Sequence, residues 1–248
     1  MFRRYLPIFA VLTLITLANS CVRAADTALI HTRIDGASVT YIAVNLTSPG
    51  VSMRPEVCTG FHGGDELFSS MVKRNRPIAA INGAYFDKIT KYPIGDLVAE
   101  GKLIHSGRMG TALAIKTDGA PEMRRVDWGH AADWTGYRTV IACGPALVLD
   151  GKIDVNPELE RFSDPHVMGS TSRMAIGYTS DMHLILAHIQ TPVTFRREAQ
   201  IMLSLGCVGA MNLDAGASLG MYYKGQFLAT PSRRLTNIIC IYERPKKP

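Results

Sequence analysis

The chain has 248 residues, of which 47% are hydrophobic and 19% charged, and this composition excludes a disordered protein. The length allows one ample hydrophobic core. The net charge of +6 comes without a long basic run outside Lys246 and Lys247, and aromatic residues do not alternate with basic ones. We therefore expect no nucleic-acid partner.

The first 24 residues have the three-part order of a secretory signal peptide. Arg3 and Arg4 precede an apolar run over residues 5–18, and small residues follow up to Ala24. Removing these residues leaves 24 basic against 21 acidic residues, a net charge of +3. No later segment is long enough to cross a bilayer, so we expect a secreted or periplasmic protein without a membrane span after cleavage. An uncleaved anchor, or a lipid attached at Cys21, is the alternative.

Three strand-like segments open the remaining chain. They are separated by Asp35–Gly36 and Pro49–Gly50, which are turn signals. The segments cover residues 28–34, 39–46 and 51–57.

Two amphipathic helices are expected from the spacing of apolar residues. The first covers residues 65–75 with Asp65 as its N-cap, and the second covers residues 194–206. Thr194 caps the second helix and Gly206 ends it.

The remaining apolar runs are short and bounded by turn residues, which is typical of strands. They cover residues 78–81, 97–104, 111–117, 139–149, 173–179, 183–189, 208–213, 221–225, 226–229 and 237–243. Strands do not alternate with helices, so the pattern predicts an α+β fold with β-rich mixed sheets and a few helices. We expect a single domain over residues 25–248.

Four cysteines follow the expected signal peptide. In an oxidising compartment they would allow two disulfides in three possible pairings, and the sequence does not choose among them. Each also lies in an apolar context, so four buried free thiols are the equal alternative. The residues are Cys58, Cys143, Cys207 and Cys240.

Residues 216–220 spell GASLG, a match to the GxSxG motif of serine hydrolases. That motif needs a helix after the serine and an acid and a histidine later in the chain. No Asp or His follows Ser218, so the usual order of the triad fails. A serine hydrolase that uses an earlier histidine stays open, although Ser218 is better interpreted as a hydrogen-bond donor to an oxyanion.

Small residues surround the lone acid Asp214. Such a loop lets a ligand approach successive main-chain N–H groups, which suits a phosphate or sugar oxygen. The alternative is a tight turn that Asp214 merely caps. The loop NGAYFD over residues 82–87 has the same order of strand, Asn, small residues and acid. We expect the two loops to meet in one pocket, with Tyr85 or Phe86 as a stacking surface for a sugar ring.

Five motifs follow one another between Pro77 and Tyr242. They read AAINGAYFD at 79–87, PIGDLVAEGKL at 93–103, SRMAIGY at 172–178, LGCVGAMNLDAGASLGMYYKG at 205–225 and RRLTNIICIY at 233–242. These resemble the patterns AINGGFFD, PxGLVIxDGKL, SRTAIGI, LGCxDALNLDGGGSxxMxxxG and ERxVxNAIxV of the phosphodiester glycosidases, the family of the N-acetylglucosamine-1-phosphodiester alpha-N-acetylglucosaminidase. Their common order is more specific than any single motif.

This resemblance implies hydrolysis of the bond between a sugar's anomeric carbon and a phosphodiester, on a carbohydrate or sugar-phosphate substrate. The oxocarbenium-like state needs a carboxylate as nucleophile or as base for water. Asp214 is the first candidate and Asp87 the second. Arginine suits a phosphate because its donors form a planar fork. The candidate substrate-binding residues are Asn82, Gly83, Phe86, Arg173, Asn212, Gly216, Ser218 and Arg234.

The chain departs from the family's pattern within the same loops. Ala84, Ala215 and Ala217 replace glycines, Gly209 replaces an Asp, and Arg233 replaces an acid. A methyl group can forbid a positive φ or narrow a pocket. A non-catalytic glycan-binding or envelope-structural module of the same fold is therefore the alternative to an enzyme.

We expect no metal or other cofactor, because no cluster of His, Cys, Asp or Glu has the spacing of metal ligands. His183 and His188 lie five residues apart on a strand, hence on opposite faces. A divalent cation such as calcium, held by Asp214 or Asp87, is the alternative that the residues leave open.

Overall fold

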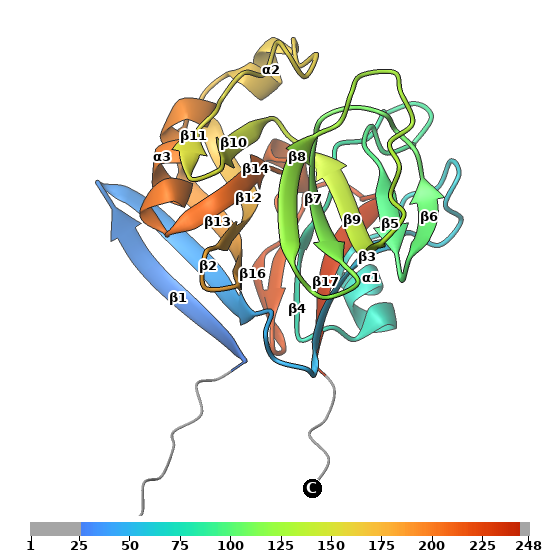
Figure 1. Ribbon diagram of the computed structural model, residues 1–248, viewed down its shortest axis with the longest axis horizontal. Coiled ribbons are helices and arrows are strands. Elements are labelled where there is room, and N and C mark those ends of the chain that lie inside the picture. Colours follow the sequence, from blue (N-terminus) through green and yellow to red (C-terminus); the bar gives the residue numbers. More distant parts are fainter. Residues whose placement is uncertain (1–25, 244–248) are drawn as a thin grey trace, which may run out of the picture.

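The computed structural model describes residues 26–243, so the expected signal peptide lies outside the described residues. Within them the chain forms three β-sheets and few helices, which confirms the prediction of a β-rich α+β domain (Figure 1). Every pairing between named strands is antiparallel, where mixed sheets were expected.

The largest sheet, called sheet A here, has seven strands in the order β1, β2, β13, β12, β14, β10, β11. These are β1 (Thr27–Ile34), β2 (Ala37–Asn45), β13 (His183–Val193), β12 (Thr171–Thr179), β14 (Cys207–Asn212), β10 (Ala146–Leu149) and β11 (Lys152–Ile153). The expected turn at Asp35–Gly36 joins β1 to β2, and both residues have positive φ.

The second sheet, sheet B, has the order β16, β15, β4, β17, β3, and the third, sheet C, the order β6, β5, β9, β7, β8. Sheet B contains β16 (Gln226–Ala229), β15 (Met221–Tyr223), β4 (Ala79–Asn82), β17 (Asn237–Glu243) and β3 (Val51–Val57). Sheet C contains β6 (Lys102–His105), β5 (Leu97–Ala99), β9 (Tyr137–Cys143), β7 (Thr111–Lys116) and β8 (Pro121–Arg125). The run expected as one strand over 139–149 divides at Gly144–Pro145, because β9 and β10 belong to different sheets.

Both expected helices are present, as α1 (Phe68–Asn75) and α3 (Phe195–Ser204). Thr194 caps α3 by accepting a hydrogen bond from the amide of Arg197, as predicted. The cap expected for α1 is wrong: the helix begins later, after Leu67, which gives no side-chain cap. Asp65 forms ion pairs with Lys91 and Arg234 instead. A third helix, α2 (Pro165–Met168), is too short for a periodic signal and was not expected.

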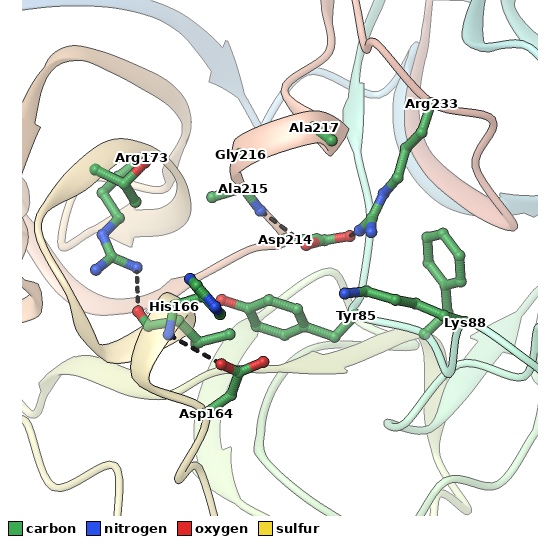
Figure 2. Close-up of a pocket in the computed structure, with 13 residues that line it drawn as sticks. Tyr85, Lys88, Asp164, His166, Arg173, Asp214, Ala215, Gly216, Ala217 and Arg233 are labelled. Atoms are coloured by element: carbon green, nitrogen blue, oxygen red, sulfur yellow. Dashed lines mark hydrogen bonds and ion pairs between the residues drawn. The ribbon is translucent and has the colours of Figure 1, made fainter.

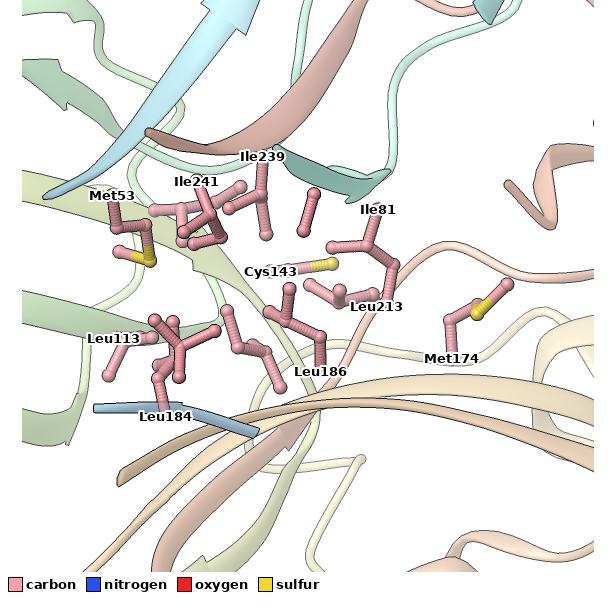
Figure 3. Close-up of a cluster of buried hydrophobic side chains, with 14 of the residues drawn as sticks. Met53, Ile81, Leu113, Cys143, Met174, Leu184, Leu186, Leu213, Ile239 and Ile241 are labelled. Carbon is pink, nitrogen blue, oxygen red and sulfur yellow. The ribbon is translucent and has the colours of Figure 1, made fainter. Parts of the chain in front are cut away.

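The main core lies where the three sheets face one another. Alternating residues of the strands point into it, as expected for sheets with one buried face. Ile81 and Ile239 come from sheet B, Leu113 from sheet C, and Met174 and Leu186 from sheet A (Figure 3). Burial of these side chains stabilises the fold and fixes the relative position of the sheets.

All four cysteines after the expected signal peptide are buried and free in the structure. This agrees with the buried-thiol alternative and not with the disulfide one. Among residues 26–243, no helix is long and apolar enough to span a membrane.

Candidate active site

A pocket of about 320 Å³ opens between the ends of sheets A and B (Figure 2). Segments far apart in the sequence form it: the loop after β4, helix α2, the start of β12, the loop after β14 and the loop before β17. Its lining residues are Tyr85, Phe86, Lys88, Asp164, His166, Val167, Thr171, Arg173, Asp214, Ala215, Gly216, Ala217 and Arg233.

The two loops that resemble each other in sequence meet beside this pocket. The side-chain amide of Asn82 donates to the main-chain carbonyl of Asp214 at 2.6 Å, and its carbonyl accepts from the amide of Gly220 at 3.1 Å. The amide of Asp214 in turn donates to the carbonyl of Gly83 at 3.3 Å. These bonds fasten the loop after β14 to the end of β4.

Asp214 lies at the centre of the pocket and is only 4% exposed. One carboxylate oxygen accepts the amide of Ala215 at 2.9 Å, and the other lies 2.5 Å from a terminal nitrogen of Arg233. Burial raises the pKa of the Asp214 carboxyl above its ordinary value, an effect that Arg233, Ser218 and the Ala215 amide partly offset. A carboxyl with a raised pKa is suited to proton transfer nearer neutral pH.

Arg233 is the pocket arginine that sequence reasoning missed. Its Nε donates to the hydroxyl of Ser218 at 2.6 Å, and its guanidinium lies 4.6 Å from the centre of the Phe86 ring. Arg234, which matched the family pattern, points elsewhere and donates to Asp65 at 2.7 Å. Arg234 was predicted to bind substrate because it matches an arginine of the family motif. The structure places Arg233, which stands where the motif has an acid, next to Asp214 instead.

Ser218 is fully buried and is not among the residues that line the pocket. It ends a short 3₁₀ helix, η1 (Gly216–Ser218), and β15 follows within three residues. A nucleophile elbow needs a strand before the serine, a helix after it and an exposed hydroxyl. Strand β14 ends at Asn212, before the loop that carries the serine, but a strand and not a helix follows, and the buried hydroxyl is held by Arg233 and Asp214.

The two alanines that replace glycines in this loop do not strain it. Ala215 has extended backbone, with φ −135° and ψ −162°, and Ala217 is not among the residues with positive φ. The left-handed conformation falls on Gly216, at φ 58°, where the sequence keeps glycine. The replacements therefore add methyl groups to the pocket wall without forcing either alanine into a strained backbone conformation.

Asn212 and Gly83 lie behind the pocket and support its walls. The side-chain amide of Asn212 donates to the hydroxyl of Tyr85 at 2.8 Å and to the carbonyl of Gly144 at 3.2 Å. A Cβ on Gly83 would lie 1.9 Å from the side-chain oxygen of Asn237, so this glycine allows a close approach of β4 and β17. Both were predicted to bind substrate, and the structure places neither among the lining residues.

Asp87, the second predicted catalytic carboxylate, is exposed and does not line the pocket. One of its oxygens accepts the amides of Ile89 and Thr90, at 2.9 and 2.6 Å, and the Thr90 hydroxyl at 3.0 Å. These bonds lower the pKa of Asp87, which is the behaviour of a turn-capping acid. The next residue, Lys88, points into the pocket instead.

Lys88 and His166 face the pocket from opposite walls, and neither was expected (Figure 2). Neither side chain forms a hydrogen bond or ion pair with another described residue. Helix α2 carries His166, and its N-cap Asp164 accepts the amide of His166 at 2.9 Å. The pocket thus holds a lysine and an imidazole that are available to a ligand.

Arg173 reaches the pocket wall, but its guanidinium is held from behind. It donates to the carbonyls of Val167 at 3.0 Å, of Val193 at 3.3 Å and of Gly169. The carboxylate of Glu198 lies 3.9 Å away, fully buried, and burial raises its pKa well above the ordinary value. Arg173 therefore positions the end of α2, and a direct contact with a phosphate is not what these bonds favour.

No group of three or more His, Cys, Asp and Glu side chains among residues 26–243 is arranged to hold a metal ion. The titratable groups that line the pocket are two acids, Tyr85 and a set of cationic or imidazole side chains, and Asp214 is the buried acid among them. A buried carboxylate beside cations can act on the electrophilic carbon of a substrate that carries a negative leaving group.

Comparison with solved structures supports the fold. The zebrafish N-acetylglucosamine-1-phosphodiester alpha-N-acetylglucosaminidase catalytic domain, auto-inhibited by its pro-peptide, superposes with a TM-score of 0.69 at 22% identity, covering 88% of this chain and 82% of that one. A Synechocystis protein described as hypothetical gives a TM-score of 0.68 at 17% identity, covering 87% of this chain and 61% of that one.

The bovine (Bos taurus) N-acetylglucosamine-1-phosphodiester alpha-N-acetylglucosaminidase is 23% identical over 192 residues, which are 66% of this chain and 36% of the relative. The mouse (Mus musculus) enzyme of the same name is 24% identical over 193 residues, 66% of this chain and 37% of the relative. The chain thus spans little more than a third of the curated relatives it matches. The family model described as phosphodiester glycosidase matches residues 75–242, more than half of the chain, and the protein therefore belongs to the phosphodiester glycosidase family.

Proposed function

We propose that this protein is an exported hydrolase that cleaves the bond between the anomeric carbon of a sugar and a phosphodiester, in an envelope or extracellular glycan. The observation that carries the proposal is the buried carboxylate of Asp214 in a pocket where the side chains of Lys88 and His166 form no hydrogen bond or ion pair within residues 26–243. Membership of the phosphodiester glycosidase family supports the reaction class.

In the proposed reaction, the bond from the anomeric carbon to the phosphate oxygen breaks, and a water oxygen becomes bonded to that carbon. One proton of the water stays on the new sugar hydroxyl, and the other leaves with the phosphate monoester or passes to solvent. Asp214 attacks the carbon itself or takes the proton from the water. A phosphate leaves as an anion and needs less protonation than an alcohol, so a single buried carboxylate suffices for the difficult step.

The leaving phosphate would lie between Lys88 and His166. A lysine ammonium binds phosphate as a point charge, and an imidazole N–H adds a directed hydrogen bond. Placing these groups where negative charge develops stabilises the transition state more than the ground state. Tyr85 and the residues around Gly216 line the remaining space, where the sugar would fit.

The test is the release of sugar from an N-acetylglucosamine-1-phosphodiester by purified protein. We expect turnover by the wild type and a loss of about 10³-fold in kcat for Asp214→Asn, the usual size for a residue that transfers a proton. Asp87→Asn is the matched control, because its carboxylate caps an exposed turn, and it should keep wild-type activity.

Two outcomes would contradict the proposal. Wild-type protein that binds saccharides without turnover would favour the non-catalytic glycan-binding module. Equal loss of activity in both Asp variants would show that Asp214 is not the catalytic carboxylate.

Export has its own test, because N-terminal sequencing of protein recovered outside the cytoplasm should begin at Ala25 or Asp26. Activity should also persist in EDTA if no divalent cation takes part.

A further inference from the structure

We propose that Arg233 exchanges partners when substrate binds, moving its guanidinium from Asp214 to the phosphate and so freeing the acid only for phosphate-bearing ligands. The sugar reaction that follows rests on the proposed function, but the exchange itself needs only an anion. Arg233 would thus determine specificity for phosphate-bearing substrates at this pocket.

The placement of Arg233 suits such an exchange. Its side chain is 29% exposed, whereas that of Asp214 is 6% exposed, so the arginine is the more accessible of the two to an incoming ligand. One terminal nitrogen contacts Asp214 and Nε contacts Ser218, while the other terminal nitrogen has no hydrogen-bond partner among the described residues. A donor is therefore already available to a ligand.

The backbone of Arg233 is fixed, and its head group is held by two hydrogen bonds and one ring contact. The amides of Ser232 and Arg233 both donate to the carbonyl of Ala217, at 3.0 and 3.3 Å, which fixes the backbone of the loop. The guanidinium lies 4.6 Å from the centre of the Phe86 ring, a contact that does not depend on its hydrogen bond to Asp214. The exchange therefore requires only the head group to move, and only the bond to Asp214 to break.

A phosphate can take the place of Asp214 as the partner of this guanidinium. It offers oxygens that match the planar fork of arginine, and it places them in the pocket, where Lys88 also points. Asp214 would keep the Ala215 amide and the Ser218 hydroxyl as donors after the exchange. The acid would stay oriented while losing its counter-cation.

A carboxylate without its counter-cation is a stronger base. Arg233 lowers the pKa of Asp214, so the departure of Arg233 raises that pKa. When the pH of the solution is close to the pKa of Asp214, this rise makes the carboxylate take up a proton. The other charged or titratable groups that line the pocket or interact with Asp214 come from the loop after β4, from β9, from β12 and from the region of α2. They are Tyr85, Lys88, Cys143, Asp164, His166 and Arg173.

The experiment is calorimetric titration with sulfate, a phosphate mimic that does not change protonation between pH 5 and 7. In two buffers of different ionisation enthalpy, wild-type protein should take up protons on binding sulfate. Arg233→Gln should bind sulfate about tenfold or more weakly, the usual cost of a lost charged hydrogen bond. Asp214→Asn should bind sulfate as tightly as the wild type or more tightly, because Arg233 is already free, and with less proton uptake than the wild type, because the amide does not titrate.

Arg234→Gln is the control, since this neighbouring arginine pairs with Asp65 outside the pocket and should leave sulfate binding unchanged. Wild-type affinity in Arg233→Gln, or weaker sulfate binding by Asp214→Asn, would overturn the exchange. Arg233→Lys should restore part of the affinity, and thermal unfolding of each variant shows whether it is folded.

The exchange and the proposed function fail in different ways. If wild-type protein shows no turnover but sulfate binding follows Arg233 and Asp214 as described, the reaction is wrong and the anion site stands. If turnover occurs and Arg233→Gln changes neither the KM for the phosphodiester nor the acidic limb of the pH profile, the reaction stands and the exchange is wrong.

Discussion

The side-chain amide of Asn82 donates to the main-chain carbonyl of Asp214 at 2.6 Å, across 132 residues of sequence. Asn82 ends β4 in sheet B, and Asp214 follows β14 in sheet A, so this bond joins two sheets next to the proposed catalytic group. The same asparagine accepts the amide of Gly220, which closes the loop around Asp214. The two loops that have a similar order of residues are thus in direct contact.

Asn82→Ala should lower the free energy of unfolding by about 2–3 kcal/mol, because two buried hydrogen bonds are lost and their partners are left unsatisfied. Urea unfolding measures this change. Asn156→Ala, at an exposed site, is the control and should remain within about 0.5 kcal/mol of the wild type. Equal stability of the two variants would contradict the role given to Asn82.

Arg173→Lys should lower the free energy of unfolding by about 3 kcal/mol or more, since a lysine cannot reach the three carbonyls that the buried guanidinium holds. Hydrogen exchange at the amides of Met168 and Gly169 should accelerate, because the end of α2 loses its anchor. Arg234→Lys provides the exposed comparison. If Arg173→Lys changed only phosphate affinity, the original assignment as a substrate ligand would be the better one.

Glu198→Gln should become relatively more stable than the wild type as pH rises. The pKa of the buried Glu198 carboxyl is raised well above its ordinary value of 4.5, so ionising it in the folded protein costs stability. The stability that the protonated Glu198 contributes to the wild type is fully present below about pH 4.5, and it is lost as the pH rises through the pKa of Glu198 in the folded protein. Unfolding midpoints from pH 4 to 8 measure the trend, and Glu158→Gln, at an exposed site, should run parallel to the wild type.

Gly83→Ala should destabilise the protein more than Gly216→Ala, although both glycines were predicted to bind substrate. A methyl at Gly83 meets the Asn237 side chain at 1.9 Å, while a methyl at Gly216 meets nothing within 4 Å. Gly216→Ala should lower the free energy of unfolding only by the cost of placing an alanine in the left-handed conformation, about 1 kcal/mol. Thermal unfolding compares them, and the reverse order of stability would show that the two turns are held differently.

Much of the fold could be predicted because its signals are local. The cap of Thr194 and the turn at Asp35–Gly36 each depend on neighbouring residues, and the structure confirms both. The meeting of the loops at Asn82 and Asp214 followed from their similar sequence. Strand and helix ends such as these could therefore be predicted from neighbouring residues. The directions of the side chains in the loops that follow strands and helices could not.

Side-chain direction explains most of what was missed. Asp87 and Lys88 are adjacent, yet Asp87 caps an exposed turn while Lys88 points into the pocket, and no pattern in the sequence separates them. Helix α2 has too few residues for a periodic signal, so His166 could not be placed. Arg233 lies in a loop, where a charge is usually solvated, and only the tertiary structure brings it to Asp214.

Because the pocket straddles two sheets, its shape depends on how those sheets sit against each other. Asp214 and Arg173 belong to the sheet A side, while Phe86 and Arg233 belong to the sheet B side. A shift of sheet A against sheet B would move Arg173 relative to Phe86 before either sheet lost its own hydrogen bonds, while Asp214 and Arg233 would stay together because Arg233 is bonded to the loop after β14 that carries Asp214. Heating should therefore abolish the proposed activity at a temperature below the midpoint of thermal unfolding.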